Sequence, residues 1–386
     1  MEDRQLLAAD IVGATPIDNG EFLLGSVTVS AVFFESDGSI DPDTEQWTDT
    51  EVDATLEKIR KGVNWWSQLL ETQNSVHSLE FTIDDTYARD RVETGYEPIT
   101  RDSGTFQRYV GDWLTDLGYG DAPSIERAVS LFNDSQRQIH QTDWAFTFFV
   151  VDSSNDDDGF FPSGFNGAFA YPGGLFIVIP SGRPVSTYAH EMGHIFWARD
   201  EYSGGGSFTD QRGYYNAPNV NAADNDTEGF VQQDSIMRGG VPAQRAFDDL
   251  VSPQSTLALV GWRDSDGDGI FDLADVPLQL DAIGSYDVDR GIYTIRGSAA
   301  VDTLANANSE GPQSDITFNR VRELQYRLGV DIDNDGEIDF GDWQTASSFD
   351  ATEVEFEFQT SITAAFDEIQ WRAIDTHVGV TSAVLS

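Results

Sequence analysis

The sequence predicts an α/β (α+β) layer followed by an all-β region. Three observations support this fold class. Strand-like and helix-like segments alternate over residues 26–202, as expected when helices cover a sheet. The segment 144–151 is apolar throughout, which is typical of a strand buried on both faces. Beyond Trp262, short alternating segments separated by turns indicate a β-sandwich.

The first part begins with residues 26–35, whose β-branched content predicts a strand. Thr48 and Glu51 form a capping box before a helical pattern that runs to Glu71. Pro184 stands near the start of a later helix. The other elements expected here are strands at 77–83, 144–151, 167–171 and 175–179 and helices at 104–117 and 123–140.

The second half of the chain changes in character. Residues 203–234 are rich in Gly, Asn, Asp and Gln and predict a long ordered loop. The sequence therefore divides into a first domain at 1–262, a linker at 263–276 and an all-β domain at 277–386. The strands expected in the last domain lie at 291–296, 321–328, 353–359 and 368–374.

The charge of the chain excludes several classes of partner. With 67 acidic and 22 basic residues, the net charge is −45, so binding to nucleic acid or to anionic lipid is not expected. Asp outnumbers Glu and there are only two lysines, a composition that fits a salty environment or a secreted, calcium-loaded protein. No apolar run reaches 18 residues, so no membrane insertion is expected.

The pattern H-E-x-x-H at His190, Glu191 and His194 is the most informative motif. Residues four apart share one helix face, so both imidazoles could reach one zinc ion, with Glu191 beside them to act on water. Asp200 follows six residues later, where a returning chain could bring a third ligand. Met237, in Ser-Ile-Met before two glycines, could place a soft side chain beneath the metal.

This motif resembles that of the metzincin clan of zinc metallopeptidases. The local sequence is also similar to that of bacterial peptidases of the IgA-peptidase type, whose motif also ends in Asp-Glu-Tyr. The similarity spans roughly residues 20–262. It implies a mixed, twisted sheet with an active-site helix. It also implies that His190, His194 and Asp200 ligate zinc, that Glu191 is the general base and that Met237 is the Met-turn residue.

The chain departs from that family's pattern at Trp197, where a glycine usually turns the chain. The helix is therefore expected to continue beyond this point, and Glu201 stays open as a substitute for Asp200. The family's tyrosine after the Met-turn is missing, so Tyr202, Tyr214 and Tyr215 are alternative candidates for stabilising an oxyanion.

The resemblance also implies where a substrate would lie. In such peptidases an extended polypeptide pairs with the edge strand of the sheet. The order of elements makes Gly167, Ala168, Phe169, Ala170 and Tyr171 that edge. An ordinary strand and turn without a binding role is an equally good interpretation of this segment.

Two twelve-residue segments match calcium loops of the EF type, with oxygen ligands at alternating positions, glycine at position 6 and a backbone carbonyl at position 7. Neither is flanked by clear amphipathic helices, so we interpret both as structural sites. The first comprises Asp264, Asp266, Asp268, Ile270, Asp272 and Asp275. The second comprises Asp331, Asp333, Asp335, Glu337, Asp339 and Asp342.

The remaining signals are weaker. The ending Arg372-Ala373-Ile374-Asp375 resembles the last strands of bacterial immunoglobulin-like modules. The triplet 156–158 is interpreted as a solvated loop. His77, His140 and His377 are interpreted as structural or surface residues.

The function that the resemblance implies is a secreted zinc endopeptidase acting on polypeptides, with zinc and calcium as cofactors. Extracellular localisation follows from the calcium load, because calcium is abundant outside cells, although residues 1–20 contain no signal peptide. Two alternatives remain: an inactive, calcium-dependent surface or adhesion protein, against which the intact Glu191 argues, and a zinc hydrolase acting on a non-peptide amide or ester. The oligomeric state stays open.

Overall fold

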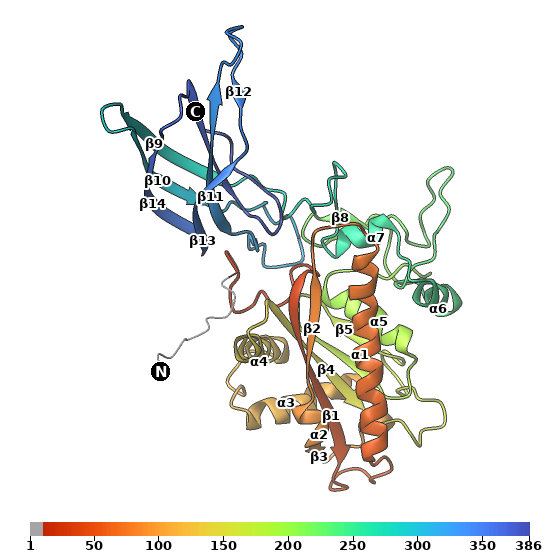
Figure 1. Cartoon of the computed structure of the whole chain (residues 1–386). Coiled ribbons are helices and arrows are strands. Elements are labelled where there is room, and N and C mark those ends of the chain that lie inside the picture. Colours follow the sequence, from red (N-terminus) through yellow and green to blue (C-terminus); the bar gives the residue numbers. More distant parts are fainter. Residues whose placement is uncertain (1–10) are drawn as a thin grey trace. The chain divides into compact units, whose positions relative to one another are not determined.

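A computed structural model of the chain describes residues 11–386 and shows a mixed α/β protein with several sheets and a sheet-rich C-terminal region (Figure 1). Residues 1–10, which belong to the segment without a visible signal peptide, lie outside the described part. The contacts divide the chain into two compact units. The first contains 14–263 and 306–314, and the second contains 11–13, 264–305 and 315–386.

The first unit is built on a mixed sheet with the strand order β2-β1-β4-β6-β5, in which β3 also pairs with β1. Strand β5 is antiparallel to β6 and forms one edge, whereas the other pairs are parallel. All eight residues of β4 are buried, which agrees with the apolar run in the sequence. The strands are β1 (Gly25–Ser36), β2 (Leu79–Asp84), β3 (Val92–Thr94), β4 (Trp144–Val151), β5 (Phe169–Tyr171) and β6 (Phe176–Pro180).

The helices of this unit begin where the sequence offers caps. Thr48 accepts the backbone N–H of Glu51 and Glu51 accepts that of Thr48, so the predicted capping box starts α1. The helices are α1 (Asp49–Glu71), α2 (Thr86–Arg89), α3 (Phe106–Asp116), α4 (Ile125–His140), α5 (Val185–Ile195), α6 (Gly240–Asp249) and α7 (Gln254–Leu259).

Helices cover both faces of the sheet (Figure 1). On one face, α3 and α4 pack against strand residues such as Phe34, Phe149 and Phe176. On the other face, α1 and α5 pack against each other, and both contact the sheet. The ring of Tyr188 in α5 is 5.8 Å from that of Phe148 in β4. Trp66 of α1 donates its indole N–H to the carbonyl of Ala189 at 2.9 Å, so α1 fixes the helix that carries the H-E-x-x-H motif.

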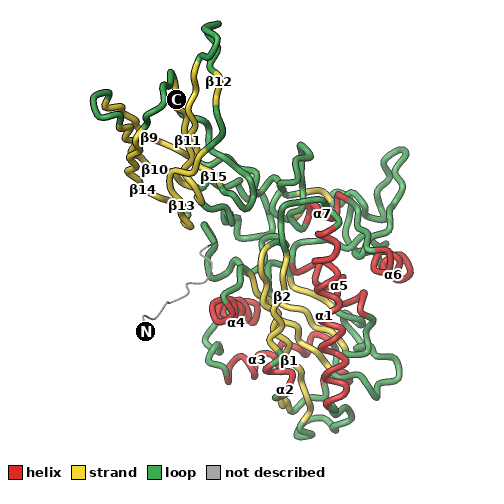
Figure 2. Tube along the Cα trace, viewed as in Figure 1, coloured by secondary structure: helices red, strands yellow, loops and turns green. Residues whose placement is uncertain are grey.

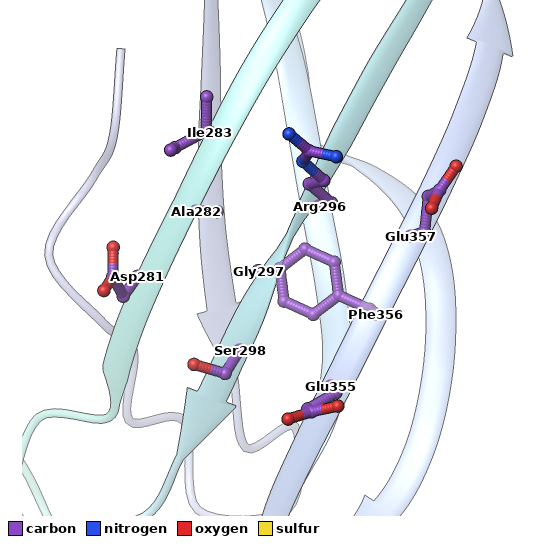
Figure 3. A pocket seen from close by; sticks show the side chains of 9 residues that line it. All are labelled: Asp281, Ala282, Ile283, Arg296, Gly297, Ser298, Glu355, Phe356 and Glu357. Carbon is purple, nitrogen blue, oxygen red and sulfur yellow. The ribbon is translucent and has the colours of Figure 1, made fainter.

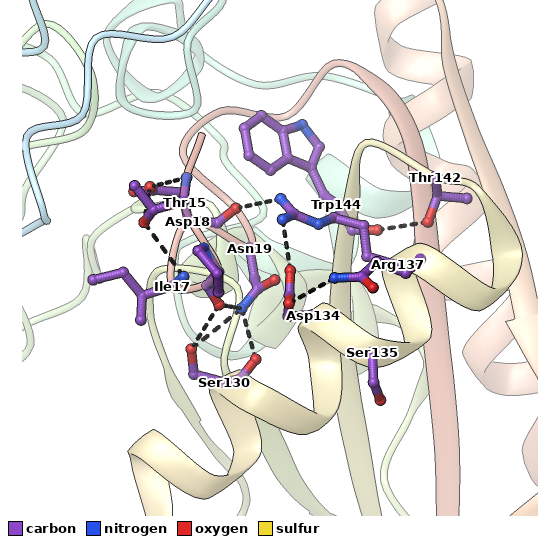
Figure 4. Close-up of polar contacts among 12 residues, drawn as sticks. Thr15, Ile17, Asp18, Asn19, Ser130, Asp134, Ser135, Arg137, Thr142 and Trp144 are labelled. Atoms are coloured by element: carbon purple, nitrogen blue, oxygen red, sulfur yellow. Dashed lines mark hydrogen bonds and ion pairs between the residues drawn. The ribbon is translucent and has the colours of Figure 1, made fainter. Parts of the chain in front are cut away.

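The segment before β1 is tied to α4 by polar contacts (Figure 4). Asn19 donates from Nδ2 to the carbonyl of Ser130 at 3.0 Å. Arg137 donates to the carbonyl of Asp18 at 3.0 Å and is itself held by Asp134 at 2.6 Å. These bonds satisfy buried backbone groups and hold the chain entering the sheet in place.

The second unit consists of two antiparallel sheets with a shared core. One sheet has the order β14-β10-β9, and the other has the order β12-β11-β13 with β15 also on β11. Ile295 from the first sheet packs with Leu324 and Trp371 from the second. The strands are β9 (Gln279–Asp287), β10 (Ile292–Ala300), β11 (Val321–Val330), β12 (Asp339–Phe340), β13 (Gln344–Ala351), β14 (Glu353–Ser361) and β15 (Glu368–Ile374).

Several elements differ from the sequence-based expectation. The segment 203–234 is largely loop, as expected, but contains the short hairpin of β7 (Gln211–Arg212) and β8 (Ala217–Pro218) (Figure 2). Strands β9 and β13 were not predicted, because their Asp, Gly and Ser residues are poor strand formers whose pairing partners lie elsewhere in the chain. Strand β5 begins at Phe169, two residues later than expected.

Among residues 11–386, none of the helices combines the length and the apolar character that a membrane crossing requires.

Candidate metal centre

Three predicted ligands converge at the C-terminal end of α5. His190 and His194 lie one helical turn apart, with ring centroids 4.9 Å apart and ring planes nearly perpendicular. The Nε2 atoms of His190 and His194 lie 3.1 and 3.2 Å from the same oxygen, Oδ1 of Asp200. The ligand atoms of the three residues lie within 4.8 Å of one another, so they could hold one metal ion.

Backbone carbonyls orient both imidazoles. Nδ1 of His190 lies 2.9 Å from the carbonyl oxygen of Ile236, and Nδ1 of His194 lies 2.8 Å from that of Ala198. Because a carbonyl only accepts, each Nδ1 carries a proton, and the Nε2 atoms are the nitrogens left to bind a metal ion. This is the tautomer that a metal bound through Nε2 requires.

The electrostatics of the cluster favour positive charge next to Asp200. Burial raises the pKa of the Asp200 carboxyl, but the two imidazoles outweigh burial and hold this pKa well below its usual range. Burial likewise lowers the pKa of His190, yet the neighbouring Asp200 and Glu191 carboxylates overcome it and raise the pKa to about 9. A cation bound between these groups would be stabilised by the same negative carboxylates.

The chain turns directly after α5 without the glycine that the family pattern contains. The expectation that the helix continues is wrong: α5 ends at Ile195, and Trp197 adopts a left-handed conformation with φ 77°. Ala198 donates its N–H to the carbonyl of Gly193 at 2.9 Å, which closes the turn. Trp197 is 3% exposed, and its ring packs against Gly173, so packing stabilises a conformation that costs about 1–2 kcal/mol.

Glu201, the alternative third ligand, is hydrogen-bonded to residues other than the imidazoles. Its side chain is fully buried and accepts hydrogen bonds from Thr256 and from Nδ2 of Asn221, the latter at 2.6 Å. Burial raises the pKa of this carboxyl. In this structure Glu201 therefore fixes the loop after Asp200, while Asp200 itself faces the histidines.

Met237 lies beneath the helix at Gly193. Its side chain is fully buried, and a Cβ atom at Gly193 would lie only 2.6 Å from the Met237 sulfur and 3.0 Å from the ring of Trp66. The glycine inside His190-Glu191-Met192-Gly193-His194 is therefore needed for close approach of Met237 and Trp66. Sequence reasoning did not assign this glycine a role.

Glu191 lies beside the imidazoles, in the same helix. Its side chain is 6% exposed. Burial raises the pKa of this carboxyl above its usual range, which suits a group that takes up and releases a proton. The nearby His190 and His194 act in the opposite direction.

Two cavities meet at this cluster and extend along the edge strand. A cavity of about 550 Å³ is lined by residues 168–172 together with His190, Glu191, His194 and Asp200. A second cavity, of about 630 Å³, is lined by Gly167, Ala168, His190 and Glu191, and by residues 238–241, which follow Met237. The predicted segment 167–171 thus borders both cavities at the edge of the sheet.

Of the three candidate tyrosines, Tyr202 lies at this cluster. Its ring stacks on that of His190 with centroids 6.3 Å apart, and it lines both cavities. Tyr214 is fully buried against Phe22. The hydroxyl of Tyr215 donates to the carbonyl of Gly261 at 3.1 Å. Tyr214 and Tyr215 are therefore both held by contacts within the fold.

The two Asp-rich loops have left-handed residues at the same two positions. The glycines at position 6, Gly269 and Gly336, both have φ 92°, and position 4 is also left-handed in both loops, as Gly267 and Asn334. In each loop the first Asp accepts backbone N–H groups of its own loop, for example from Gly269 to Asp264 at 3.0 Å and from Gly336 to Asp331 at 3.0 Å.

The structure brings together only the first three acids of each loop as a group that could hold a metal ion: Asp264, Asp266 and Asp268, and Asp331, Asp333 and Asp335. Asp275 is nonetheless close to its loop. Burial raises its pKa first, and Asp268, Asp266, Asp272 and Asp264 raise it further. In the second loop, Asp339 begins β12 and Asp342 follows that strand.

The other predicted residues lie elsewhere. Nε2 of His140 is 3.7 Å from Asp84, and the backbone N–H of His377 donates to Asp375. Asp156 accepts N–H groups of its own turn. A further open cavity, of about 620 Å³, lies on the three-stranded sheet of the second unit and includes no predicted site residue (Figure 3).

Sequence reasoning missed the arginines of the cleft. Arg199 and Arg212 line the first cavity, and Arg183 and Arg238 line the second. The only available signal was the scarcity of basic residues in the sequence, which makes each one informative. Glu310, which binds Arg199 and Arg212, reaches this unit from a segment about 100 residues away in the chain.

Comparison with known proteins adds little to this description. No family model and no curated protein matches the chain. A solved structure, wild-type OgpA from Akkermansia muciniphila, matches with 11% sequence identity over 97% of this chain and 96% of that chain. The TM-score of this match is 0.27.

Proposed function

We propose that the chain is a secreted, zinc-dependent endopeptidase of the metzincin type. The observation that carries this proposal is the convergence of His190, His194 and Asp200 beside the buried Glu191, at the floor of a cleft along the edge strand. Two histidines and a carboxylate form a donor set suited to zinc, and the cleft leaves room for a further ligand.

His190, His194 and Asp200 would hold the ion, and Met237 would pack beneath them. When bound, zinc supplies Lewis acidity, which lowers the pKa of water and polarises a carbonyl group. The carbonyls of Ile236 and Ala198 keep the imidazoles in the metal-binding tautomer. Asp200 rather than Glu201 is the third ligand in this proposal, since Glu201 is bound by Asn221 and Thr256.

Glu191 is the general base. It takes a proton from the water that attacks the scissile carbonyl and then delivers this proton to the leaving amine. Its burial supports this role, because a raised pKa lets the carboxyl hold the proton between the two steps. Tyr202 is the tyrosine placed to donate to a developing oxyanion, since it is the candidate that lines the cleft.

A polypeptide substrate would pair with the free edge of β5, using Gly167, Ala168, Phe169, Ala170 and Tyr171. An edge strand has unpaired backbone groups that an extended peptide satisfies. The two cavities next to this edge would receive side chains on either side of the scissile bond. The net charge of −45 argues against nucleic acid as a partner.

The second unit is proposed to be an immunoglobulin-like β-sandwich stabilised by calcium. Its two packed antiparallel sheets fit this class of fold. The equal backbone conformations of the two Asp-rich loops support calcium sites at Asp264 to Asp275 and at Asp331 to Asp342. Calcium sites of this kind suit an extracellular protein.

The test is a comparison of the wild type with Glu191→Gln on a proteome-derived peptide library. Cleavage by the wild type should stop on zinc removal and return when zinc is restored. Glu191→Gln should retain one zinc per chain and lose activity by about 100-fold or more, because general-base catalysis typically contributes that much.

Metal analysis that finds no zinc in protein purified without a chelator would contradict the proposal. Cleavage that Glu191→Gln leaves unchanged would also contradict it. If zinc binds but no peptide is cleaved, while small amides or esters are hydrolysed, the alternative of a non-peptide hydrolase replaces it.

A further inference from the structure

The arginines of the cleft differ in what they bind. Four of them line the two cavities beside the metal-site residues. Arg212 donates from Nε to Glu310 at 2.8 Å, and Arg199 is paired with the same carboxylate. Arg238 is paired with Asp234 at 3.2 Å. Three of the four are therefore already neutralised by carboxylates of the chain itself.

Arg183 is the exception. Among residues 11–386 its guanidinium has no carboxylate within ion-pair distance, and its Nε is buried without a hydrogen-bond acceptor. The other arginines that line the two cavities all have a carboxylate partner. An unpaired, partly buried charge is costly, and a bound anion would offset this cost.

The position of Arg183 is fixed by its surroundings. It lies in the turn between β6 and α5, and Lys58 of α1 donates to the carbonyl of Ser181 at 2.7 Å and to that of Arg183 at 3.2 Å. Its guanidinium stacks on the ring of Phe160, 4.2 Å from the centroid. The stacked ring holds the planar group and leaves its edge for a ligand.

The guanidinium faces the start of the edge segment. A Cβ atom at Gly167 would lie 3.5 Å from Nη2 of Arg183. A substrate strand pairing antiparallel to β5 runs from the Tyr171 end toward the Gly167 end. In that arrangement Arg183, which lines the cavity of about 630 Å³ together with His190 and Glu191, would lie on the side of the residue that follows the scissile bond.

We propose that Arg183 binds a carboxylate of the substrate, so that the enzyme favours peptides with an acidic side chain, or the terminal carboxylate, directly after the scissile bond. The guanidinium fork matches a carboxylate with two parallel hydrogen bonds. This inference rests on the proposed peptidase function, which it deepens by naming the substrate class.

The experiment compares cleavage sites in a peptide library for the wild type, Arg183→Gln and the matched control Arg238→Gln. Arg238 lines the same cavity but is already paired with Asp234. The wild type should show Glu and Asp enriched directly after the scissile bond. Arg183→Gln should lose this enrichment, whereas Arg238→Gln should keep it.

Matched peptides then separate the two sources of the carboxylate. One carries Glu after the scissile bond with an amidated end, the second carries Gln with an amidated end, and the third ends in a free carboxylate at that point. The wild type should cleave the preferred carboxylate peptide with kcat/KM about 10-fold or more above the amidated Gln peptide, a ratio typical of a charged hydrogen bond.

Arg183→Gln should lower kcat/KM for the carboxylate peptides and leave the Gln peptide unchanged, with Arg183→Lys in between. Equal cleavage of all three peptides by the wild type overturns the inference. An equal loss on all peptides in Arg183→Gln, together with a shifted pH profile, also overturns it, because Arg183 would then act through Glu191. Cleavage of the Gln peptide that depends on Glu191 upholds the proposed function even if this inference fails.

Discussion

The candidate zinc cluster and the two Asp-rich loops bring possible metal ligands together in different ways. His190, His194 and Asp200 are partly buried, and their orientation depends on carbonyls at Ile236 and Ala198. The first three acids of each loop are largely exposed and accept hydrogen bonds from N–H groups of their own loop.

The left-handed residues next to these sites are also stabilised differently, locally in the loops and by tertiary packing after α5. In each loop, glycine at position 6 adopts φ 92°, a conformation that glycine reaches without strain. After α5, Trp197 adopts φ 77° and is held there by packing. A local site thus depends on its own sequence, whereas the candidate zinc cluster depends on segments distant in the chain.

The largest expected effect concerns Asp200 and its neighbour Glu201. Removal of a residue that only hydrogen-bonds to a metal ligand weakens metal binding by up to ~100-fold. Asp200→Asn should weaken zinc binding by more than this, because it removes the charge of a ligand itself. Glu201→Gln should instead leave zinc bound and reduce stability by about 1–3 kcal/mol, because it disturbs buried hydrogen bonds with Asn221 and Thr256. Zinc titration and thermal unfolding of both variants measure the two effects.

The opposite pattern, with zinc lost in Glu201→Gln and kept in Asp200→Asn, would make Glu201 the ligand. It would also show that the orientation of Asp200 toward both imidazoles has no part in metal binding.

The next effect concerns the loops. With calcium affinities typical of extracellular modules, 5 mM calcium should stabilise the second unit by about 1–2 kcal/mol per site. Calorimetry with zinc held constant should show a melting transition that rises with calcium. The double variant Asp264→Asn and Asp331→Asn should lose this rise without losing peptide cleavage.

A melting transition that does not respond to calcium would remove the structural role given to the loops. A loss of peptide cleavage in the double variant, with zinc still bound, would mean that the loops and the zinc cluster are not the independent sites described above.

The smallest effect tests the turn after α5. Trp197→Ala and Trp197→Gly both remove the packed indole, but only glycine relieves the left-handed backbone. Trp197→Gly should therefore be more stable than Trp197→Ala by about 1 kcal/mol. Urea unfolding of the two variants measures the difference, and a more stable alanine variant would show that the backbone is not strained there.

Much of the fold follows from local patterns. The capping box at Thr48 and Glu51 starts α1 as predicted, because both partners lie within four residues. The apolar run of β4 is buried as predicted. Strands β9 and β13 escaped prediction because their polar residues form strands only when partners such as β10 and β11 lie beside them.

The candidate site likewise has features that local sequence predicts and features that depend on distant contacts. H-E-x-x-H predicts a helix face with His190 and His194, since helical geometry alone sets that spacing. The roles of Tyr202, Gly193 and Arg183 could not be predicted, because each depends on a contact across the fold: with the ring of His190, with Met237, and with the edge of β5.

The sequence by itself determined the helix that carries the two histidines, the buried central strand and the two loops of equal shape, because these depend on neighbours within a few residues. Only the tertiary structure decided that Trp197 turns the chain, that Asp200 rather than Glu201 faces the imidazoles, and that Arg183 stays unpaired in the cleft. The physical reason is that these features depend on packing, burial and charge supplied by residues far away in the chain.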